Sequence, residues 1–181
     1  MKDNLRAAIV QDDESGEILM LGWMDEEAYT ATLDTGLVHF FSRSRQQLWQ
    51  KGETSGNTLA LRSVVPDCDN DAMVIRAVPN GPTCHDGTST CFAPWLWRKI
   101  VQRKNELPTS SYVAQLLQGG TPAIAQKVGE EATEVVVAAL SESDERVVSE
   151  VADLWFHTLT LLASRNIDLT AVEAELRRRD R

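Results

Sequence analysis

Residues 67–71 read Asp67-Cys68-Asp69-Asn70-Asp71, a stretch in which three carboxylates alternate with a thiol and an amide. If the segment is extended, its side chains alternate between two faces, so that Asp67, Asp69 and Asp71 share one face and Cys68 points to the other. Carboxylates at that spacing suit Mg²⁺, whereas thiolates suit Zn²⁺. The stretch therefore predicts two metals of different chemistry. An acidic surface turn beside a buried free cysteine is the alternative.

Two further cysteines, Cys84 and Cys91, complete the set of three. Three cysteines cannot all pair within one chain, and metal binding or catalysis is the better use for them in a reducing compartment. Structural zinc sites usually take four protein ligands, but catalytic zinc sites take three and leave a position for water. The three cysteines therefore favour a catalytic site. His85 is either a fourth ligand, an exposed loop residue or, as we prefer, a proton-transfer group, since histidine ordinarily titrates near neutral pH.

The predicted alternation also places Cys68 away from the aspartates beside it. In that geometry Cys68 does not reach a zinc ion held by Cys84 and Cys91 of its own chain. We therefore expect a homodimer in which two copies of the chain share the zinc site.

Length and composition set broad limits. The chain has 181 residues, 43% hydrophobic and 25% charged, which is ordinary for one large or two small globular domains. We expect a cytoplasmic protein, because the sequence contains neither an apolar stretch of about 18 residues nor a signal peptide. The net charge of -9 argues against nucleic-acid binding. A phosphorylated small substrate stays possible, since bound Mg²⁺ and a few cations can reverse the field inside a pocket.

The sequence pattern changes near residue 93. Before it, short apolar runs between turn residues predict strands over 7–10, 18–23, 37–41, 58–65 and 73–78 and one helix over 25–36. After it, helical patterns predict a short helix containing Leu96, Ile100 and Val101 and then helices over about 111–118, 122–140, 144–164 and 170–179. We expect an α+β, mostly strand domain over residues 1–92 and an all-α bundle over residues 93–181.

A polar loop follows the strand predicted over 37–41. It concentrates arginine, lysine, hydroxyl groups and glycine, which suits phosphate binding, and its tryptophan could stack on a base. An ordinary polar surface loop is equally compatible with this composition. The candidate substrate-binding residues are Ser42, Arg43, Ser44, Arg45, Trp49, Lys51, Gly52, Glu53, Thr54, Ser55, Gly56 and Asn57.

The helical half carries a second set of carboxylates. Their spacings of three and four residues place each set on one face of its helix, beside an apolar stripe. Carboxylates there are costly unless they hold a cation, so two such facing helices predict a Mg²⁺ site. A pair of ordinary amphipathic helices with solvated acids is the alternative. The candidate ligands are Glu130, Glu131, Glu134, Glu150 and Asp153.

Two other residues of the same helix stand out. Lys127 lies one turn before the acids and could bind a phosphate. Gly129 costs roughly 1 kcal/mol relative to alanine in a helix interior, so close approach of another element is expected there.

The two halves resemble two enzyme families of histidine biosynthesis. The first resembles phosphoribosyl-AMP cyclohydrolase through LMLGWM (19–24), EEAY (26–29), SRSR (42–45), LWQKGETSGN (48–57), DCDND (67–71) and CHDGTSTCF (84–92). The second resembles phosphoribosyl-ATP pyrophosphatase, an all-α, MazG-like pyrophosphohydrolase, through SSYVAQLL (110–117), KVGEEATEVV (127–136) and EVADLWFH (150–157). The order of the halves is that of the fused bifunctional form.

The resemblance implies roles for individual residues. It places Mg²⁺ ligands at Asp67, Asp69 and Asp71 and a dimer-shared zinc at Cys68, Cys84 and Cys91. It makes His85 a proton-transfer residue and the polar loop a substrate-binding region. In the helical half it places Mg²⁺ ligands at Glu131, Glu134, Glu150 and Asp153, with Glu130 nearby and Glu131 and Glu134 as catalytic residues.

The implied reactions are successive. The C-terminal half converts phosphoribosyl-ATP to phosphoribosyl-AMP and pyrophosphate, and the N-terminal half then opens the adenine ring by hydrolysis at carbon six. Two other functions remain open at this stage. One is a general nucleotide pyrophosphatase with an attached non-catalytic zinc module, and the other is a binding or regulatory protein with inert sites.

Overall fold

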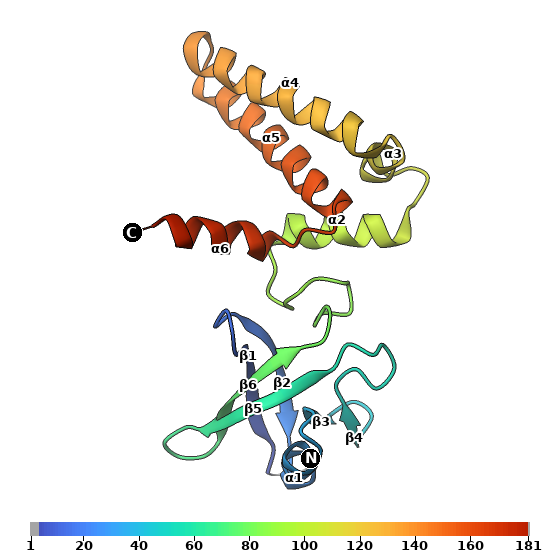
Figure 1. The fold of residues 1–181 in the computed structure, drawn as a ribbon, viewed down its shortest axis with the longest axis vertical. Coiled ribbons are helices and arrows are strands. Elements are labelled where there is room, and N and C mark those ends of the chain that lie inside the picture. The colour runs from blue at the N-terminus through green and yellow to red at the C-terminus, as the bar shows by residue number, and fades with distance from the viewer. Residues whose placement is uncertain (1–3, 181) are drawn as a thin grey trace. The chain divides into compact units, whose positions relative to one another are not determined.

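The structure, a computed structural model, describes residues 4–180 of the chain. Residues 1–3 and 181, the outer ends of the two predicted domains, lie outside the described residues. The chain divides into two compact units between Ala93 and Pro94. The first is rich in strands and the second is helical, which confirms the predicted two-domain arrangement (Figure 1). Each unit is described by itself.

The first unit is built on a four-stranded sheet in the order β2-β1-β6-β5. Its strands are β1 (Arg6–Asp12), β2 (Ile18–Met24), β5 (Leu59–Pro66) and β6 (Ala72–Pro79). The two central strands, β1 and β6, are parallel, and each pairs antiparallel with its outer neighbour. A separate hairpin joins β3 (His39–Ser42) to β4 (Gln47–Gln50), with Phe40 opposite Trp49.

One helix, α1 (Glu26–Thr35), links the sheet to the hairpin. The Asp25 carboxylate accepts a hydrogen bond from the Ala28 amide at 2.9 Å, and Gly36 ends the helix in the left-handed region at φ 70°. The core is formed by fully buried side chains that alternate along β1 and β6 and by Phe40 of the hairpin. This core supports the turns that carry the polar residues of the unit.

The structure corrects two expectations for this unit. Residues 67–71 are not extended, because they form the turn that joins β5 to β6, with Asn70 in the left-handed region at φ 66°. The predicted polar loop is also not continuous, since residues 47–50 form the strand β4. The other strands and α1 are confirmed to within a few residues.

Over residues 94–180 the second unit contains five helices. They are α2 (Trp95–Glu106), α3 (Tyr112–Gln118), α4 (Gly120–Ser141), α5 (Asp144–Ser164) and α6 (Leu169–Arg179), which confirms the predicted helices. The Ser111 hydroxyl caps α3 by accepting from the Ala114 amide at 3.4 Å. The long helices α4 and α5 form an antiparallel pair, against which α2 and α3 pack (Figure 1).

Two further observations concern the helices. Within residues 4–180, none of them is both long and apolar enough to cross a membrane. A Cβ atom built on Gly129 of α4 meets no heavy atom within 4 Å. The prediction that another element approaches Gly129 closely is therefore wrong within a single described chain.

Two candidate metal centres and a candidate substrate loop

The turn between β5 and β6 gathers its three aspartates. Asp67, Asp69 and Asp71 each offer a carboxylate oxygen, and these atoms lie within 4.8 Å of one another at the surface. The Asp67 carboxylate accepts a hydrogen bond from the Ala72 amide at 3.2 Å, which ties the turn to the start of β6. The turn thus brings the three carboxylates together, although its side chains do not alternate between two faces as those of a strand do.

The electrostatics of this turn show how crowded the carboxylates are. Hydrogen bonding to Asp67 raises the pKa of Asp71, and the negative charges of Asp69 and Asp67 raise it further. Desolvation acts to raise the pKa of Asp67, but hydrogen bonds from the Ala72 amide and from Asp71 outweigh it and lower that pKa. Three oxygen donors this close together suit a hard cation such as Mg²⁺.

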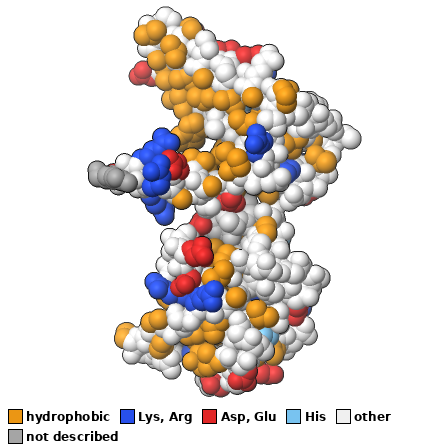
Figure 2. All heavy atoms as spheres, in the orientation of Figure 1, with side chains coloured by type: hydrophobic (Ala, Val, Ile, Leu, Met, Phe, Trp, Pro, Cys, Tyr) orange, Lys and Arg blue, Asp and Glu red, His pale blue; other side chains and the backbone are white. Residues whose placement is uncertain are grey.

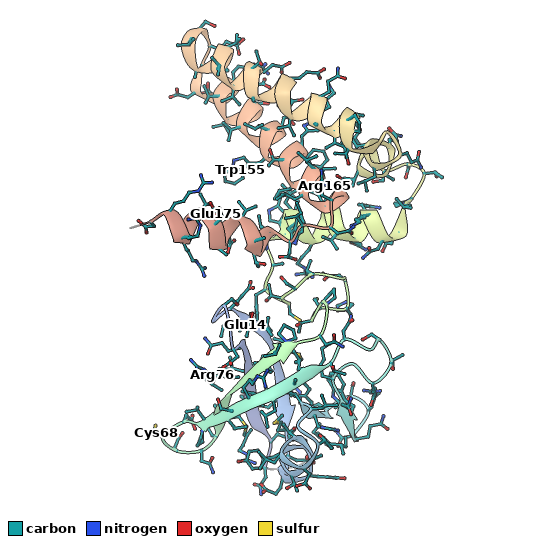
Figure 3. The ribbon with its side chains drawn as sticks, viewed as in Figure 1. Glu14, Cys68, Arg76, Trp155, Arg165 and Glu175 are labelled. Atoms are coloured by element: carbon teal, nitrogen blue, oxygen red, sulfur yellow. The ribbon has the colours of Figure 1, made fainter. Side chains whose placement is uncertain are left out.

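The cysteines fall into a pair and a single residue. Cys84 is buried and Cys91 is half-buried, and a hydrogen bond joins their side chains. Burial and the neighbouring Cys84 raise the pKa of Cys91 to about 11. Cys68 is instead exposed at the β5–β6 turn (Figure 3). Among residues 4–180, no group of three possible metal ligands within 4.8 Å includes a cysteine.

Two side chains approach the cysteine pair. His85 is exposed, and its Nδ1 lies 3.8 Å from the Cys84 Sγ. Lys51 is buried and its ammonium group donates a hydrogen bond to the Asn57 carbonyl at 3.2 Å. Burial lowers the pKa of Lys51, while the charges of Cys91 and Cys84 act in the opposite direction. One chain therefore offers two sulfur donors for a soft metal, with a cation and an imidazole nearby.

A cavity of about 630 Å³ lies beside the β3–β4 hairpin, with Ser42, Arg43, Ser44, Arg45 and Trp49 in its lining. The Arg45 guanidinium lies 5.9 Å from the centre of the Trp49 ring. The Arg43 guanidinium lies 4.5 Å from the centre of the Trp23 ring. Paired arginines over aromatic rings at an open cavity suit an anionic ligand with a planar group.

The rest of the predicted loop forms a separate turn after β4. The amide of Gln50 donates to the Glu53 carboxylate at 3.2 Å, and the amide of Asn57 donates to the Ser55 hydroxyl at 3.3 Å. Glu53 also lies 3.8 Å from Arg45. Gly52, Thr54 and Gly56 complete the turn. These contacts fix the turn and connect it to Arg45 of the hairpin.

The second acidic cluster lies between α4 and α5. Oxygens of Glu131, Glu150 and Asp153 lie within 4.8 Å of one another, and the first two residues are buried. Glu134 joins this group through a hydrogen bond to Glu150. Desolvation raises the pKa of Glu150, and the hydrogen bond and charge of Glu134 raise it further. The antiparallel helices therefore assemble four of the five predicted carboxylates into a site that favours a divalent cation.

Basic residues border this cluster. Arg146 forms ion pairs with Glu150 of the cluster and, at 3.0 Å, with Glu142. The Lys127 ammonium lies 2.6 Å from Glu130, and this contact raises the pKa of Lys127 and lowers that of Glu130. Glu130 is therefore directed to Lys127 and is not one of the three residues whose oxygens gather.

Sequence reasoning missed several residues of these sites. Trp23 and Arg146 were not candidates, and neither were Tyr112 and His157, which contact each other beside the second cluster. A signal existed for His157, because it lies seven residues after Glu150 and four after Asp153, on the same face of one helix. Trp23 carried no comparable signal, since its stacking on Arg43 joins distant segments.

Comparison with known proteins gives two family matches. Residues 20–93 match phosphoribosyl-AMP cyclohydrolase, and residues 94–180 match phosphoribosyl-ATP pyrophosphohydrolase. The chain is 48% identical over 186 aligned residues to the histidine biosynthesis bifunctional protein HisIE of Escherichia coli K12, covering 98% of this chain and 92% of that protein. It is 47% identical to the proteins of the same name in Salmonella typhimurium LT2, with 98% and 92% covered, and in Shewanella oneidensis, with 97% and 87% covered.

A strand-rich unit and a helical unit, each with a cluster of carboxylates, define a two-domain hydrolase. The chain belongs to the bifunctional histidine-biosynthesis family that joins a phosphoribosyl-AMP cyclohydrolase to a phosphoribosyl-ATP pyrophosphohydrolase. The family resemblance drawn from the sequence motifs is confirmed. The two other functions left open by the sequence lose their support, because the relatives match both halves together.

Two glycines of the turn after β4 provide a matched test of its geometry. Both have positive φ, +84° at Gly52 and +79° at Gly56, but a Cβ at Gly52 meets the Asn57 carbonyl oxygen at 2.5 Å, whereas one at Gly56 meets nothing within 4 Å. Gly56→Ala should cost about 1–2 kcal/mol of stability. Gly52→Ala should cost more and should impair ring opening, since it displaces the carbonyl that binds Lys51. Urea unfolding measures the stability of each variant, and assays of phosphoribosyl-AMP turnover measure ring opening. Equal losses in the two variants would contradict the close contact between Gly52 and the Asn57 carbonyl as the cause.

Proposed function

We propose how this bifunctional hydrolase divides two consecutive steps of histidine biosynthesis between its units. The helical unit acts first and hydrolyses phosphoribosyl-ATP to phosphoribosyl-AMP and pyrophosphate. The strand-rich unit then opens the adenine ring of phosphoribosyl-AMP. The assignment is carried by one observation, namely that both acidic clusters form in a chain that matches both families along almost its whole length.

We assign each of the two hydrolytic activities to the whole domain predicted from the sequence. Residues 1–92 form the cyclohydrolase domain and residues 93–181 form the pyrophosphohydrolase domain. The family match begins at residue 20. The strand β1 lies before that residue and pairs with both β2 and β6 in the centre of the sheet. This pairing supports including the residues before residue 20 in the cyclohydrolase domain.

Ring opening requires water to add at carbon six of the adenine ring. The bond from that carbon to the neighbouring ring nitrogen then breaks. The water loses both of its protons as the carbonyl forms, one to the nitrogen outside the ring and the other to this ring nitrogen. His85 is placed to carry one of these protons, since it is exposed beside Cys84. Zn²⁺ held by cysteine thiolates lowers the pKa of a bound water toward neutrality. The arginines of the hairpin and the turn after β4 bind the phosphate and ribose portions of the substrate.

The aspartates of the β5–β6 turn form the Mg²⁺ site of the first unit. The gathered oxygens and the raised pKa of Asp71 support this role, because a cation at the turn relieves the repulsion among Asp67, Asp69 and Asp71. The pair of sulfur atoms at Cys84 and Cys91 suits the softer Zn²⁺. The unit therefore separates its metals by the chemistry of their ligands.

The helical unit has the architecture of a MazG-like pyrophosphohydrolase. Support comes from its antiparallel pair α4 and α5, which presents Glu131 and Glu134 from one helix and Glu150 and Asp153 from the other. Mg²⁺ held by these carboxylates would offset the negative charge of the triphosphate. Lys127 binds a phosphate when the substrate displaces its contact with Glu130.

The protein acts as a homodimer with two shared zinc sites. The exposed position of Cys68 supports sharing, since a chain by itself gathers only the pair formed by Cys84 and Cys91. The helical unit also has exposed apolar side chains on α4 and α5, including Leu140 at 82% and Trp155 at 66% exposure (Figure 2). Gly129 lies seven and eleven residues before Val136 and Leu140, on the same face of α4, where a second copy can approach closely.

Separate inactivation of the two units tests the assignment. Cys91→Ala should abolish ring opening, so that phosphoribosyl-AMP accumulates from phosphoribosyl-ATP. Glu134→Gln should block pyrophosphate release, while added phosphoribosyl-AMP is still opened. Pyrophosphate and the opened product are measured with each purified variant. Loss of both activities in either folded variant contradicts the assignment of one reaction to each unit.

Mixing two inactive variants tests the shared zinc site. Cys68→Ala and Cys91→Ala should each lose ring opening alone. When both are co-expressed, half of the dimers combine one copy of each and contain one intact site, so about a quarter of wild-type activity and zinc content should return. A site built within one chain predicts no recovery, and a monomer that retains zinc also contradicts the proposal.

A further inference from the structure

His157 of α5 lies directly behind the acidic cluster of the helical unit. It is buried, with 4% of its surface exposed. Its Nδ1 lies 2.9 Å from the Asp153 carbonyl oxygen and 3.6 Å from the Glu131 Oε1. A single imidazole nitrogen thus approaches the backbone of one residue of the cluster and the carboxylate of another.

These contacts assign the tautomer of the ring. A carbonyl oxygen only accepts hydrogen bonds, so the Nδ1 of His157 carries the proton that points to Asp153. In the neutral ring the Nε2 is then an acceptor, and it lies 3.3 Å from the Tyr112 hydroxyl, which can donate to it. The hydrogen bonds run in one direction, from the hydroxyl of Tyr112 through the imidazole to the backbone of Asp153.

Aromatic packing fixes the position of the same ring. The rings of Tyr112 and Phe156 are stacked, with centroids 5.9 Å apart and an interplanar angle of 15°. The His157 ring stands edge-on to both, at 87° to Tyr112 and 83° to Phe156. Tyr112 begins α3, so these contacts connect a third helix to the cluster between α4 and α5.

We propose that His157, oriented by Tyr112, is a positioning residue that directs its Nδ1–H toward the Asp153 carbonyl and the Glu131 carboxylate and thereby sets the geometry of the acidic cluster. This inference rests on the proposed pyrophosphohydrolase function of the helical unit. Groups that orient metal-binding side chains from behind typically change metal affinity or activity by about 10–100-fold when they are replaced.

A buried histidine can also simply fill space in a helical core. Two substitutions of similar size separate these roles. His157→Asn keeps a donor near the position of Nδ1, whereas His157→Gln places its amide near the position of Nε2 and leaves Nδ1 without a substitute. A role in filling space predicts similar behaviour for both variants, but a positioning role predicts that only His157→Asn retains function.

The primary measurement is Mn²⁺ binding by calorimetry to the full-length, metal-free protein. Glu150→Gln serves as a reference, since the binding phase that it abolishes belongs to the helical unit. In that phase His157→Gln should weaken the affinity about 10–100-fold. His157→Asn should stay close to wild type, and Tyr112→Phe should weaken binding about fivefold through the loss of one hydrogen bond. Thr160→Val, a buried change on the same helix at a hydroxyl that donates to the Phe156 carbonyl, should leave the affinity unchanged.

Ring opening of phosphoribosyl-AMP by the first unit should be unaffected in all these variants. Equal Mn²⁺ affinity in wild type, His157→Gln and Tyr112→Phe overturns the positioning role, as does equal weakening in His157→Asn and His157→Gln. Tyr112→Phe removes only a hydroxyl group from a residue that is about half exposed, so it keeps the test valid if the histidine variants do not fold. The proposed function fails separately, if the wild-type protein releases no pyrophosphate from phosphoribosyl-ATP.

Discussion

Repulsion between carboxylates held close together is the constraint on which both units depend. In the first unit one turn places three aspartates with oxygens within 4.8 Å, and in the second two helices place Glu131, Glu150 and Asp153 equally close. Burial and the neighbouring Glu134 raise the pKa of Glu150, and hydrogen bonding to Asp67 and the nearby negative charges raise that of Asp71. Like charges so near one another repel, which favours a bound cation. The rest of the fold holds these carboxylates where a bound metal ion can offset their electrostatic repulsion.

The two units meet this constraint in different ways. The strand-rich unit exposes its acids on a turn, so the central strands β1 and β6 provide the rigid base and the acids stay accessible. The helical unit buries Glu131 and Glu150 between long helices, where Arg146 and His157 supply nearby donors. A buried carboxylate needs more support than an exposed one, because water does not offset its charge.

Much of this organisation follows from the sequence. The helical cluster was predictable because the periodicity of a helix fixes which acids share a face, and only Glu130 turned elsewhere, to Lys127. The aspartates were predicted to cluster for a wrong reason, since a turn rather than a strand gathers them. The strand β4 and the stacking of Arg43 on Trp23 were not predictable, because both depend on pairing between segments that the local pattern does not specify.

The most direct test of this account is anomalous diffraction at the zinc and manganese edges from crystals grown with Zn²⁺ and Mn²⁺. The account predicts a zinc peak at the sulfur atoms of Cys84, Cys91 and the Cys68 of a second copy, with no fourth side chain bound. It also predicts manganese peaks at the aspartate turn and between α4 and α5. A zinc ion closed by a fourth side chain, or the absence of manganese from both acidic clusters, would contradict it.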